Sequence, residues 1–278
     1  MPYKIIGDSC TDLPKALKED SHFKLVPLTL IVDDTTIEDN ETFDQKGFLS
    51  KVKASPNCPK SACPSPQDYM KEFEGDEDNY VITLSSNLSG SYNSAELAKK
   101  LYQEDCPNKN IKVIDSRSAS VAQTLIAMKI KELIEAGLSF QTISDKIEAF
   151  RDSIKTKFVL ESLDTLRKNG RLSGIQAFIC SALNIKPVMG ATKEGAIYKL
   201  DQARGIVKAL ILMAKAIEQD VLRPQERILG IAHCNNYERA LLVKDEILKR
   251  IPFKDCFIVD TAGVSSMYAN EGGIITAY

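Results

Sequence analysis

Short apolar segments alternate with segments of helical periodicity along most of the chain, and this alternation constrains the fold more than any other feature. Four of the apolar runs are rich in Ile, Val or Leu and end in polar residues, and we predict them as strands: 3–9, 25–34, 80–85 and 111–116. Helices are predicted between and after them, over 43–54, 89–104, 119–136 and 139–153. Alternating strands and helices are typical of α/β proteins.

The pattern begins again at about residue 155, which places a domain boundary at 153. The second part is predicted to contain strands at 157–162, 227–233, 255–260 and 272–278, a hairpin of 185–192 and 196–202, and helices at 162–170, 173–184, 204–219 and 236–250. A loop is predicted for the Pro- and Ser-rich residues 55–66. The sequence therefore predicts two α/β domains, 1–153 and 154–278.

Composition excludes several classes of protein. The 278 residues carry a net charge of −2, so no electrostatic feature favours nucleic acid or a membrane surface as a partner. No apolar run approaches the roughly 20 residues that span a bilayer. The first residues include Asp8 and Asp12 and are too polar for a signal peptide. We expect a soluble, cytoplasmic protein.

Cysteine and histidine usage gives no sign of a metal site. The seven cysteines are scattered and odd in number, no C-x-x-C is present, and the chain has two histidines. We expect reduced thiols, no metal ion and no cofactor.

No common catalytic motif is found. The chain has no G-x-G-x-x-G and no G-x-S-x-G, and GATKEGAI (190–197) lacks the Lys-Ser/Thr of a phosphate-binding loop. His233 at a strand end is expected to be structural. Carboxylates at strand ends are expected to cap turns and helices, and they are Asp8, Asp12, Asp115 and Asp260. No catalytic residue is predicted.

The segment ITLSSNLSGSYNSAELAKKL (82–101) changes abruptly from apolar to hydroxyl-bearing residues at a predicted strand–helix junction. Such a junction directs the free N–H groups of the helix toward the carboxyl edge of the sheet, where open α/β sheets bind ligands. Serine hydroxyls add neutral donors, so the junction suits an anionic oxygen group. The alternative is that Ser89 only caps the helix.

Several stretches together resemble the DegV family. They are KIIGDSCTDLP (4–14), KSACPSPQDY (60–69), LSSNLSGSYNSA (84–95), VIDSRSAS (113–120), SLDTLRKNGRLS (162–173), LNIKPVM (183–189), QARG (202–205), HCNN (233–236) and YANEGGI (268–274). The resemblance implies a bacterial fatty-acid-binding protein that is not an enzyme. A lipid tunnel would lie between two domains, and a separate fatty acid kinase subunit would phosphorylate the bound carboxylate.

The resemblance also assigns roles to residues. Ser61 and Ser89 match the family's carboxylate-binding hydroxyls, whereas Ala62 and Cys63 replace a serine and a glutamine of its pattern. Tyr268 stands where many members have histidine, and Ser91 and Tyr268 are candidates for a secondary pocket.

Two arginines are candidates for docking the kinase, namely Arg171 and Arg204, the latter at the start of the helix predicted from 204. The alternative for Arg171 is pairing with a nearby carboxylate. The alternative function is an enzyme acting on an acyl or phosphorylated substrate, with Asp8, Ser9 or His233 as its base.

Overall fold

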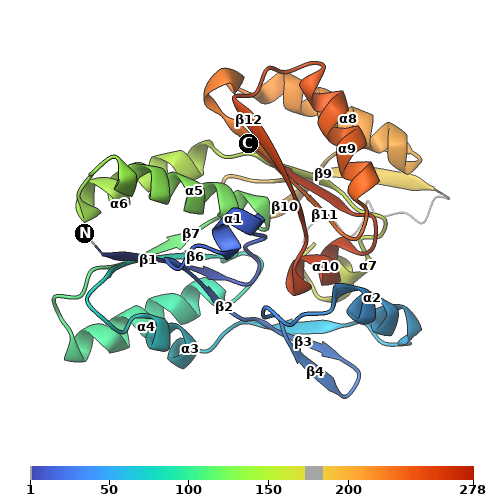
Figure 1. The fold of residues 1–278 in the computed structure, drawn as a ribbon. Coiled ribbons are helices and arrows are strands. Elements are labelled where there is room, and N and C mark those ends of the chain that lie inside the picture. The colour runs from blue at the N-terminus through green and yellow to red at the C-terminus, as the bar shows by residue number, and fades with distance from the viewer. Residues whose placement is uncertain (1, 173–183) are drawn as a thin grey trace.

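The computed structural model describes residues 2–172 and 184–278, so the helix predicted over 173–184 falls outside them except for its last residue. The chain forms a mixed α/β structure with three sheets (Figure 1). The predicted α/β class is confirmed, while the division into domains at 153, where a helix ends, stays a prediction.

A four-stranded parallel sheet forms the N-terminal layer, in the order β2-β1-β6-β7. Its strands are β1 (Tyr3–Asp8), β2 (Phe23–Val26), β6 (Asp78–Thr83) and β7 (Ile111–Asp115). Buried apolar side chains pack two pairs of helices onto its two faces: α5 (Val121–Glu135) with α6 (Phe140–Ser153), and α3 (Pro66–Glu72) with α4 (Ser91–Asp105) (Figure 1).

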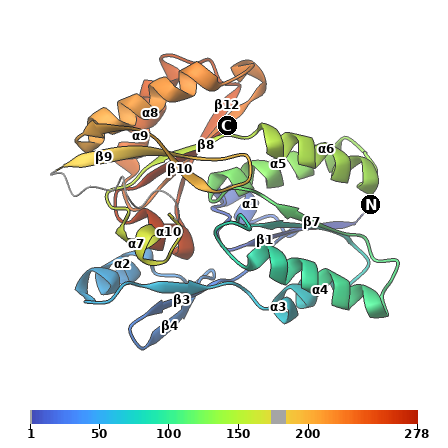
Figure 2. The ribbon, with the colours of Figure 1, turned by 180° about the vertical axis from the view of Figure 1, so that it is seen from behind.

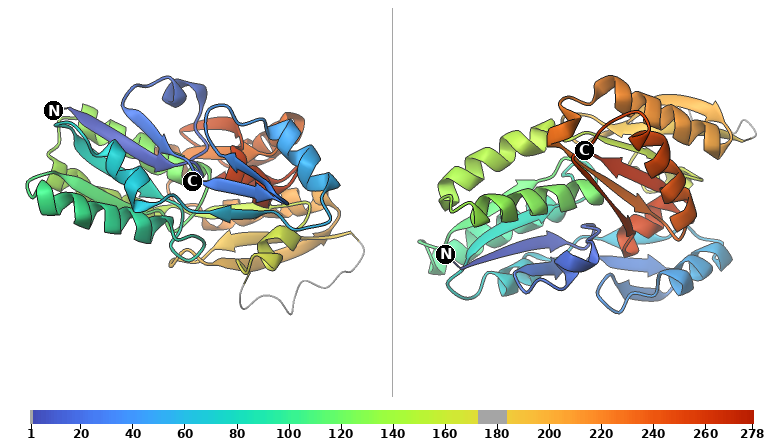
Figure 3. Two further views of the ribbon diagram at one scale, coloured as in Figure 1. Left: turned by 90° about the horizontal axis from the view of Figure 1, so that it is seen from below. Right: turned by 45° about the horizontal axis from the view of Figure 1, so that its top comes forward.

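A six-stranded sheet, in the order β10-β9-β8-β13-β11-β12, lies beside the first (Figure 3). Its strands are β8 (Thr156–Val159), β9 (Ile185–Ala191), β10 (Ile197–Arg204), β11 (Ile228–His233), β12 (Asp255–Asp260) and β13 (Ile274–Ala277). All neighbours are antiparallel except β11 and β12. The predicted hairpin is confirmed as β9 and β10, which Figure 2 shows from behind.

A small antiparallel sheet was not predicted. It contains β3 (Thr29–Val32), β4 (Thr35–Glu38) and β5 (Lys60–Ala62), and α2 (Gln45–Ala54) lies next to it (Figure 3). The single strand expected over 25–34 is wrong, because the chain leaves the first sheet at Pro27, which has no N–H to continue a ladder. The loop expected over 55–66 contains β5. The remaining elements are α1 (Lys15–Lys18), α7 (Asp164–Lys168), the 3-10 helix Pro224–Glu226 and α10 (Gly263–Ala269).

Helix α5 is buried between the two large sheets. Its residues Val121, Ala122 and Leu125 pack against the six-stranded sheet, whereas Ile126 and Ile130 pack against the four-stranded sheet. A helix that is covered on two sides must be apolar around most of its circumference. This explains why the helical periodicity of 119–136 is imperfect in the sequence.

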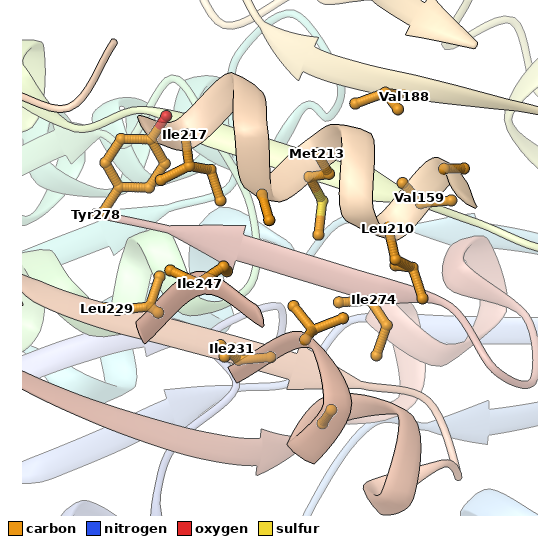
Figure 4. Close-up of a cluster of buried hydrophobic side chains, with 14 of the residues drawn as sticks. Val159, Val188, Leu210, Met213, Ile217, Leu229, Ile231, Ile247, Ile274 and Tyr278 are labelled. Atoms are coloured by element: carbon orange, nitrogen blue, oxygen red, sulfur yellow. The ribbon is translucent and has the colours of Figure 1, made fainter. Parts of the chain in front are cut away.

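The outer face of the six-stranded sheet is covered by α8 (Ile206–Asp220) and α9 (Tyr237–Leu248). Figure 4 shows the apolar side chains between them, including Met213, Ile217, Ile231 and Ile247. Among residues 2–172 and 184–278, every helix is too short or too polar to cross a membrane.

Replacement of Ile247 by alanine should lower the free energy of unfolding by about 2–5 kcal/mol, because a fully buried side chain leaves a cavity in this core. The matched control is Leu242→Ala on the same helix, where the side chain is 43% exposed and the loss should stay below about 1 kcal/mol. Urea denaturation measures both. Equal losses would contradict the packing of α9.

Candidate functional site

An apolar cavity lies between the carboxyl edge of the four-stranded sheet and the inner face of the six-stranded sheet. Leu84 and Ala119 follow β6 and β7, while Phe158 and Ile275 come from β8 and β13, and Val264 comes from α10. The space between the lining side chains is about 730 Å³, including the part that is open to solvent. The cavity thus collects side chains from segments far apart in the sequence.

Strand β8 runs along the cavity, so its residues define the two ends. Thr156, Phe158 and Leu160 alternate along one face of this segment and all three line the cavity. The antiparallel partner β13 starts opposite Val159 and ends opposite Thr156. Because α10 precedes β13, its last residues Tyr268 and Ala269 line the Leu160 end of the cavity. At about 3.3 Å per residue, Thr156 lies about 13 Å from Leu160 along the strand.

Polar groups gather at the Leu160 end. The Tyr268 hydroxyl forms a 3.2 Å hydrogen bond with the hydroxyl of Ser61, which β5 places there. Arg171 lines the same region, and its Nε donates to the backbone oxygen of Leu88 over 3.0 Å. The structure therefore places two of the residues singled out in the sequence in the cavity wall, Arg171 and Tyr268, and Ser61 is bonded to Tyr268.

Ser89 lies next to this group but does not cap α4 through its side chain. The N-cap is Gly90, and the Ser89 hydroxyl oxygen accepts the N–H of Ser91 over 3.2 Å. A Cβ on Gly90 would lie 3.0 Å from the Cys63 sulfur, so the segments carrying Ser61 and Ser89 touch. The Ser89 side chain is partly exposed.

Ser91 is part of a buried network beneath α4 and not of the cavity wall. Its hydroxyl donates to the Asp8 carboxylate over 2.5 Å and bonds the Tyr69 hydroxyl over 2.7 Å. The Asp8 carboxylate also accepts the N–H of Leu84 and the side-chain amide of Gln123. Burial raises the pKa of Asp8, while these donors lower it.

The serine-rich segment between β6 and α4 also fixes the hairpin of β9 and β10 across the cavity. The Ser85 hydroxyl donates to the backbone oxygen of Gly195 over 2.8 Å, and the Asn87 amide donates to that of Glu194 over 2.5 Å. Gly195 has a φ of +88°, and a Cβ there would lie 2.3 Å from the Ser85 hydroxyl oxygen. The serine-rich segment thus positions the hairpin as well as Ser89.

Arg204 is exposed and belongs to a different surface. It ends β10, and α8 begins at Ile206 after the positive-φ residue Gly205, so the expectation that Arg204 opens a helix is wrong. The Arg204 side chain makes no hydrogen bond or ion pair with the residues that the structure describes. Arg171, by contrast, binds backbone oxygens and not a carboxylate.

Two buried carboxylates from the N-terminal part hold the start of α10. Asp12 accepts the N–H of Ala262 over 2.6 Å, and Asp39 accepts those of Gly263 and Val264 over 2.6 and 2.8 Å. Burial raises the pKa of Asp12 to about 7 and that of Asp39 to about 6, although these donors lower both. The role of Asp39 was not predicted, because no local pattern pairs it with a segment 224 residues away.

The remaining carboxylates singled out at strand ends bind backbone N–H groups of nearby loops. Asp115 accepts those of Ser86 and Arg117, and Asp260 accepts those of Asn235 and Thr261. Asp115 and Asp260 thus cap nearby backbone N–H groups, as the sequence predicted for carboxylates at strand ends.

The residues considered as a catalytic base lie outside the cavity lining. The Ser9 hydroxyl donates to Asp39 and accepts the N–H of Leu28. The Asp8 carboxylate is hydrogen-bonded to Leu84, Ser91 and Gln123. The His233 Nδ1 accepts the N–H of Asn236 over 3.2 Å, and burial lowers the pKa of this imidazole. Within residues 2–172 and 184–278, no cluster of three or more His, Cys, Asp or Glu side chains is arranged to hold a metal ion.

The fold and the cavity define an α/β protein with an apolar ligand-sized space between its sheets. The family model described as an uncharacterised protein of the DegV family matches residues 2–277. A DegV domain-containing protein of Streptococcus gordonii is 38% identical, and the alignment covers 100% of this chain and 99% of that protein. The chain therefore belongs to the DegV family.

Solved structures of the same family superpose over nearly the whole chain. A DegV family protein of Ruminococcus gnavus, refined with vaccenic acid, is 46% identical with a TM-score of 0.97, and 99% of each chain is covered. The fatty acid kinase (Fak) B3 protein of Streptococcus pneumoniae, loaded with linoleic acid, is 36% identical with a TM-score of 0.88 over 100% of this chain and 99% of the other.

The raised pKa values of Asp12 and Asp39 predict an unusual pH dependence of stability. At Asp12 and Asp39 the native state binds more protons than the unfolded chain between about pH 4 and pH 7, so these two groups lower the free energy of unfolding as pH rises through that window. Asp12→Asn should remove part of this slope, up to about 1.4 kcal/mol per pH unit.

Urea denaturation at several pH values between 4 and 8 measures the slope. The exposed control Asp245→Asn should keep the wild-type profile. An Asp12→Asn profile parallel to that of the wild type would contradict the assignment.

Proposed function

We propose that this protein binds a long-chain fatty acid in the apolar cavity, with the carboxylate at the Ser61, Ser89 and Tyr268 end. The observation that carries the proposal is an apolar cavity whose wall includes the Tyr268 side chain, with the Ser61 hydroxyl bonded to Tyr268 and the Ser89 segment touching that of Ser61. The vaccenic and linoleic acids held by the Ruminococcus and Streptococcus proteins support it.

A hydrogen count shows what these hydroxyls offer. The Ser61 and Tyr268 hydroxyls carry two hydrogens, and their mutual bond uses one. The Ser89 oxygen accepts an N–H, so its own hydrogen is also available. Two donors are thus available for the two oxygens of a carboxylate without a lysine or histidine among them. Tyr268 supplies a hydroxyl where many DegV proteins have the histidine of the family pattern.

The apolar wall would supply most of the affinity. Each buried methylene contributes roughly 0.8 kcal/mol, so a long acyl chain is held mainly by its tail. Neutral donors orient the carboxylate and offset its desolvation, and they leave the group available for chemistry by another protein.

We further propose that the protein presents the carboxylate to a separate fatty acid kinase subunit, which forms the acyl phosphate. The likeness to the fatty acid kinase B3 protein supports this role. The exposed Arg204, without an ion-pair partner among the described residues, is the docking residue we favour. Arg171 is better explained as a residue that fixes Leu88 beside the carboxylate site.

Removal of the hydroxyls should weaken fatty-acid binding in steps. Ser89→Ala removes a donor to a buried anion and should cost about 1–3 kcal/mol. In Ser61→Ala or Tyr268→Phe the remaining hydroxyl of the pair keeps its hydrogen, so the loss should be smaller than in the Ser61→Ala, Tyr268→Phe double variant. Calorimetric titration of the delipidated protein with stearic acid measures the change.

The control for this series is Ser86→Ala, in the same segment, because the Ser86 hydroxyl bonds Asp115 instead. It should bind stearic acid like the wild type. Wild-type affinity in the Ser61→Ala, Ser89→Ala double variant would show that the carboxylate lies elsewhere.

Arg204→Ala should keep its bound fatty acid and lose acyl-phosphate formation with the cognate kinase. The control is Arg223→Ala, at another exposed arginine. The fatty acid bound to this variant should be phosphorylated at the wild-type rate. Lipid content by mass spectrometry and acyl-phosphate formation are measured on the same samples. If the fatty acid bound to Arg204→Ala is phosphorylated at the wild-type rate, Arg204 is not part of the docking surface. If the variant loses its lipid, Arg204 has a structural role.

A further inference from the structure

A second pair of hydroxyls lines the cavity at the end away from Tyr268. The hydroxyls of Ser118 and Thr156 bond each other over 2.7 Å, and both residues belong to the cavity wall. Ser118 is 6% exposed and Thr156 is 7% exposed. A polar pair at this depth is unexpected in a wall built to hold an aliphatic tail.

The position of the pair follows from the strand register. Thr156 is paired with Ala277 at the end of β13, whereas α10 and Tyr268 come before the start of that strand. The pair therefore lies about 13 Å farther along β8 than Leu160, and the carboxylate site lies beyond Leu160. A bound acyl chain would meet the Ser118–Thr156 pair along its length, away from Tyr268.

The backbone around Ser118 fixes this arrangement. Its N–H donates to the Ser116 hydroxyl over 3.1 Å, and its carbonyl oxygen accepts the N–H of Ser85 over 2.9 Å. Thr156 is the first residue of β8. Thr156 is thus held by a strand, and Ser118 by backbone hydrogen bonds of the loop between β7 and α5.

The hydrogen count repeats that of the carboxylate end. Two hydroxyls carry two hydrogens, and the bond between them uses one. Neither hydroxyl bonds any further atom of the residues that the structure describes. One buried hydroxyl hydrogen is therefore left without an acceptor. Because an unmet buried donor is costly, we expect an oxygen atom inside the cavity to accept it.

We propose that Ser118 and Thr156 form a subsite for an oxygen function on the acyl chain away from the carboxylate, so that the protein prefers hydroxy or oxo fatty acids to unsubstituted ones. This inference rests on the proposed binding of fatty acids. The distal oxygen accepts the available hydrogen, while the rest of the tail packs against Phe158 and Ile275.

The test compares stearic acid with 10-, 12- and 18-hydroxystearic acids by titration of the delipidated wild-type protein. One net hydrogen bond corresponds to about a 2- to 10-fold gain in affinity, expected for at least one of the hydroxylated acids. In Ser118→Ala and in Thr156→Val, the remaining hydroxyl keeps its hydrogen, so the preference should survive in either single variant. The double variant should lose the preference and bind stearic acid at least as well as the wild type.

The control Ile197→Val changes an apolar part of the wall and should keep the preference. If the wild type binds stearic acid but favours none of the hydroxylated acids, the subsite is overturned while fatty-acid binding stands. A preference that persists in the double variant would overturn it as well. If no long-chain acid binds, the proposed function fails, and the subsite fails with it.

Discussion

The cavity depends on the hydrogen bonds that join Asp12 and Asp39 to the first turn of α10. These carboxylates come from the N-terminal part of the chain, and the helix that they hold carries Val264, Ser265, Tyr268 and Ala269 into the cavity wall. Burial of two carboxylates is costly, as their raised pKa values show. The backbone N–H donors at the start of α10 offset that cost only while α10 stays in place, so they favour the position of α10 in the wall.

Hydroxyl chemistry follows from this closed, apolar setting. The cationic side chain in the wall, Arg171, donates to backbone oxygens, whereas a serine or tyrosine hydroxyl can bond a neighbour and still keep one hydrogen for a ligand. The same arrangement occurs twice, in Ser61 with Tyr268 and in Ser118 with Thr156. The wall between them is mainly apolar, which matches an elongated ligand with a polar group at one end.

The sequence was informative where the pattern is local. The alternation of strands and helices predicted the α/β class, and the serine-rich junction lies at the carboxyl edge of the sheet beside the cavity. Residues whose role depends on distant partners were missed: Asp39 binds a helix far along the chain, and Ser91 turns to Asp8 because its helix position faces the sheet. The break at Pro27 and the start of α8 after Arg204 depend on pairing that no short window contains.

A crystal structure of the protein purified with its bound lipid would show where the carboxylate lies. We expect one acyl chain in the cavity, with carboxylate oxygens within hydrogen-bonding distance of the Ser89 hydroxyl and of the Ser61–Tyr268 pair, and with the tail running along β8 toward Thr156. A carboxylate at the Thr156 end, or a lipid bound outside this cavity, would contradict it.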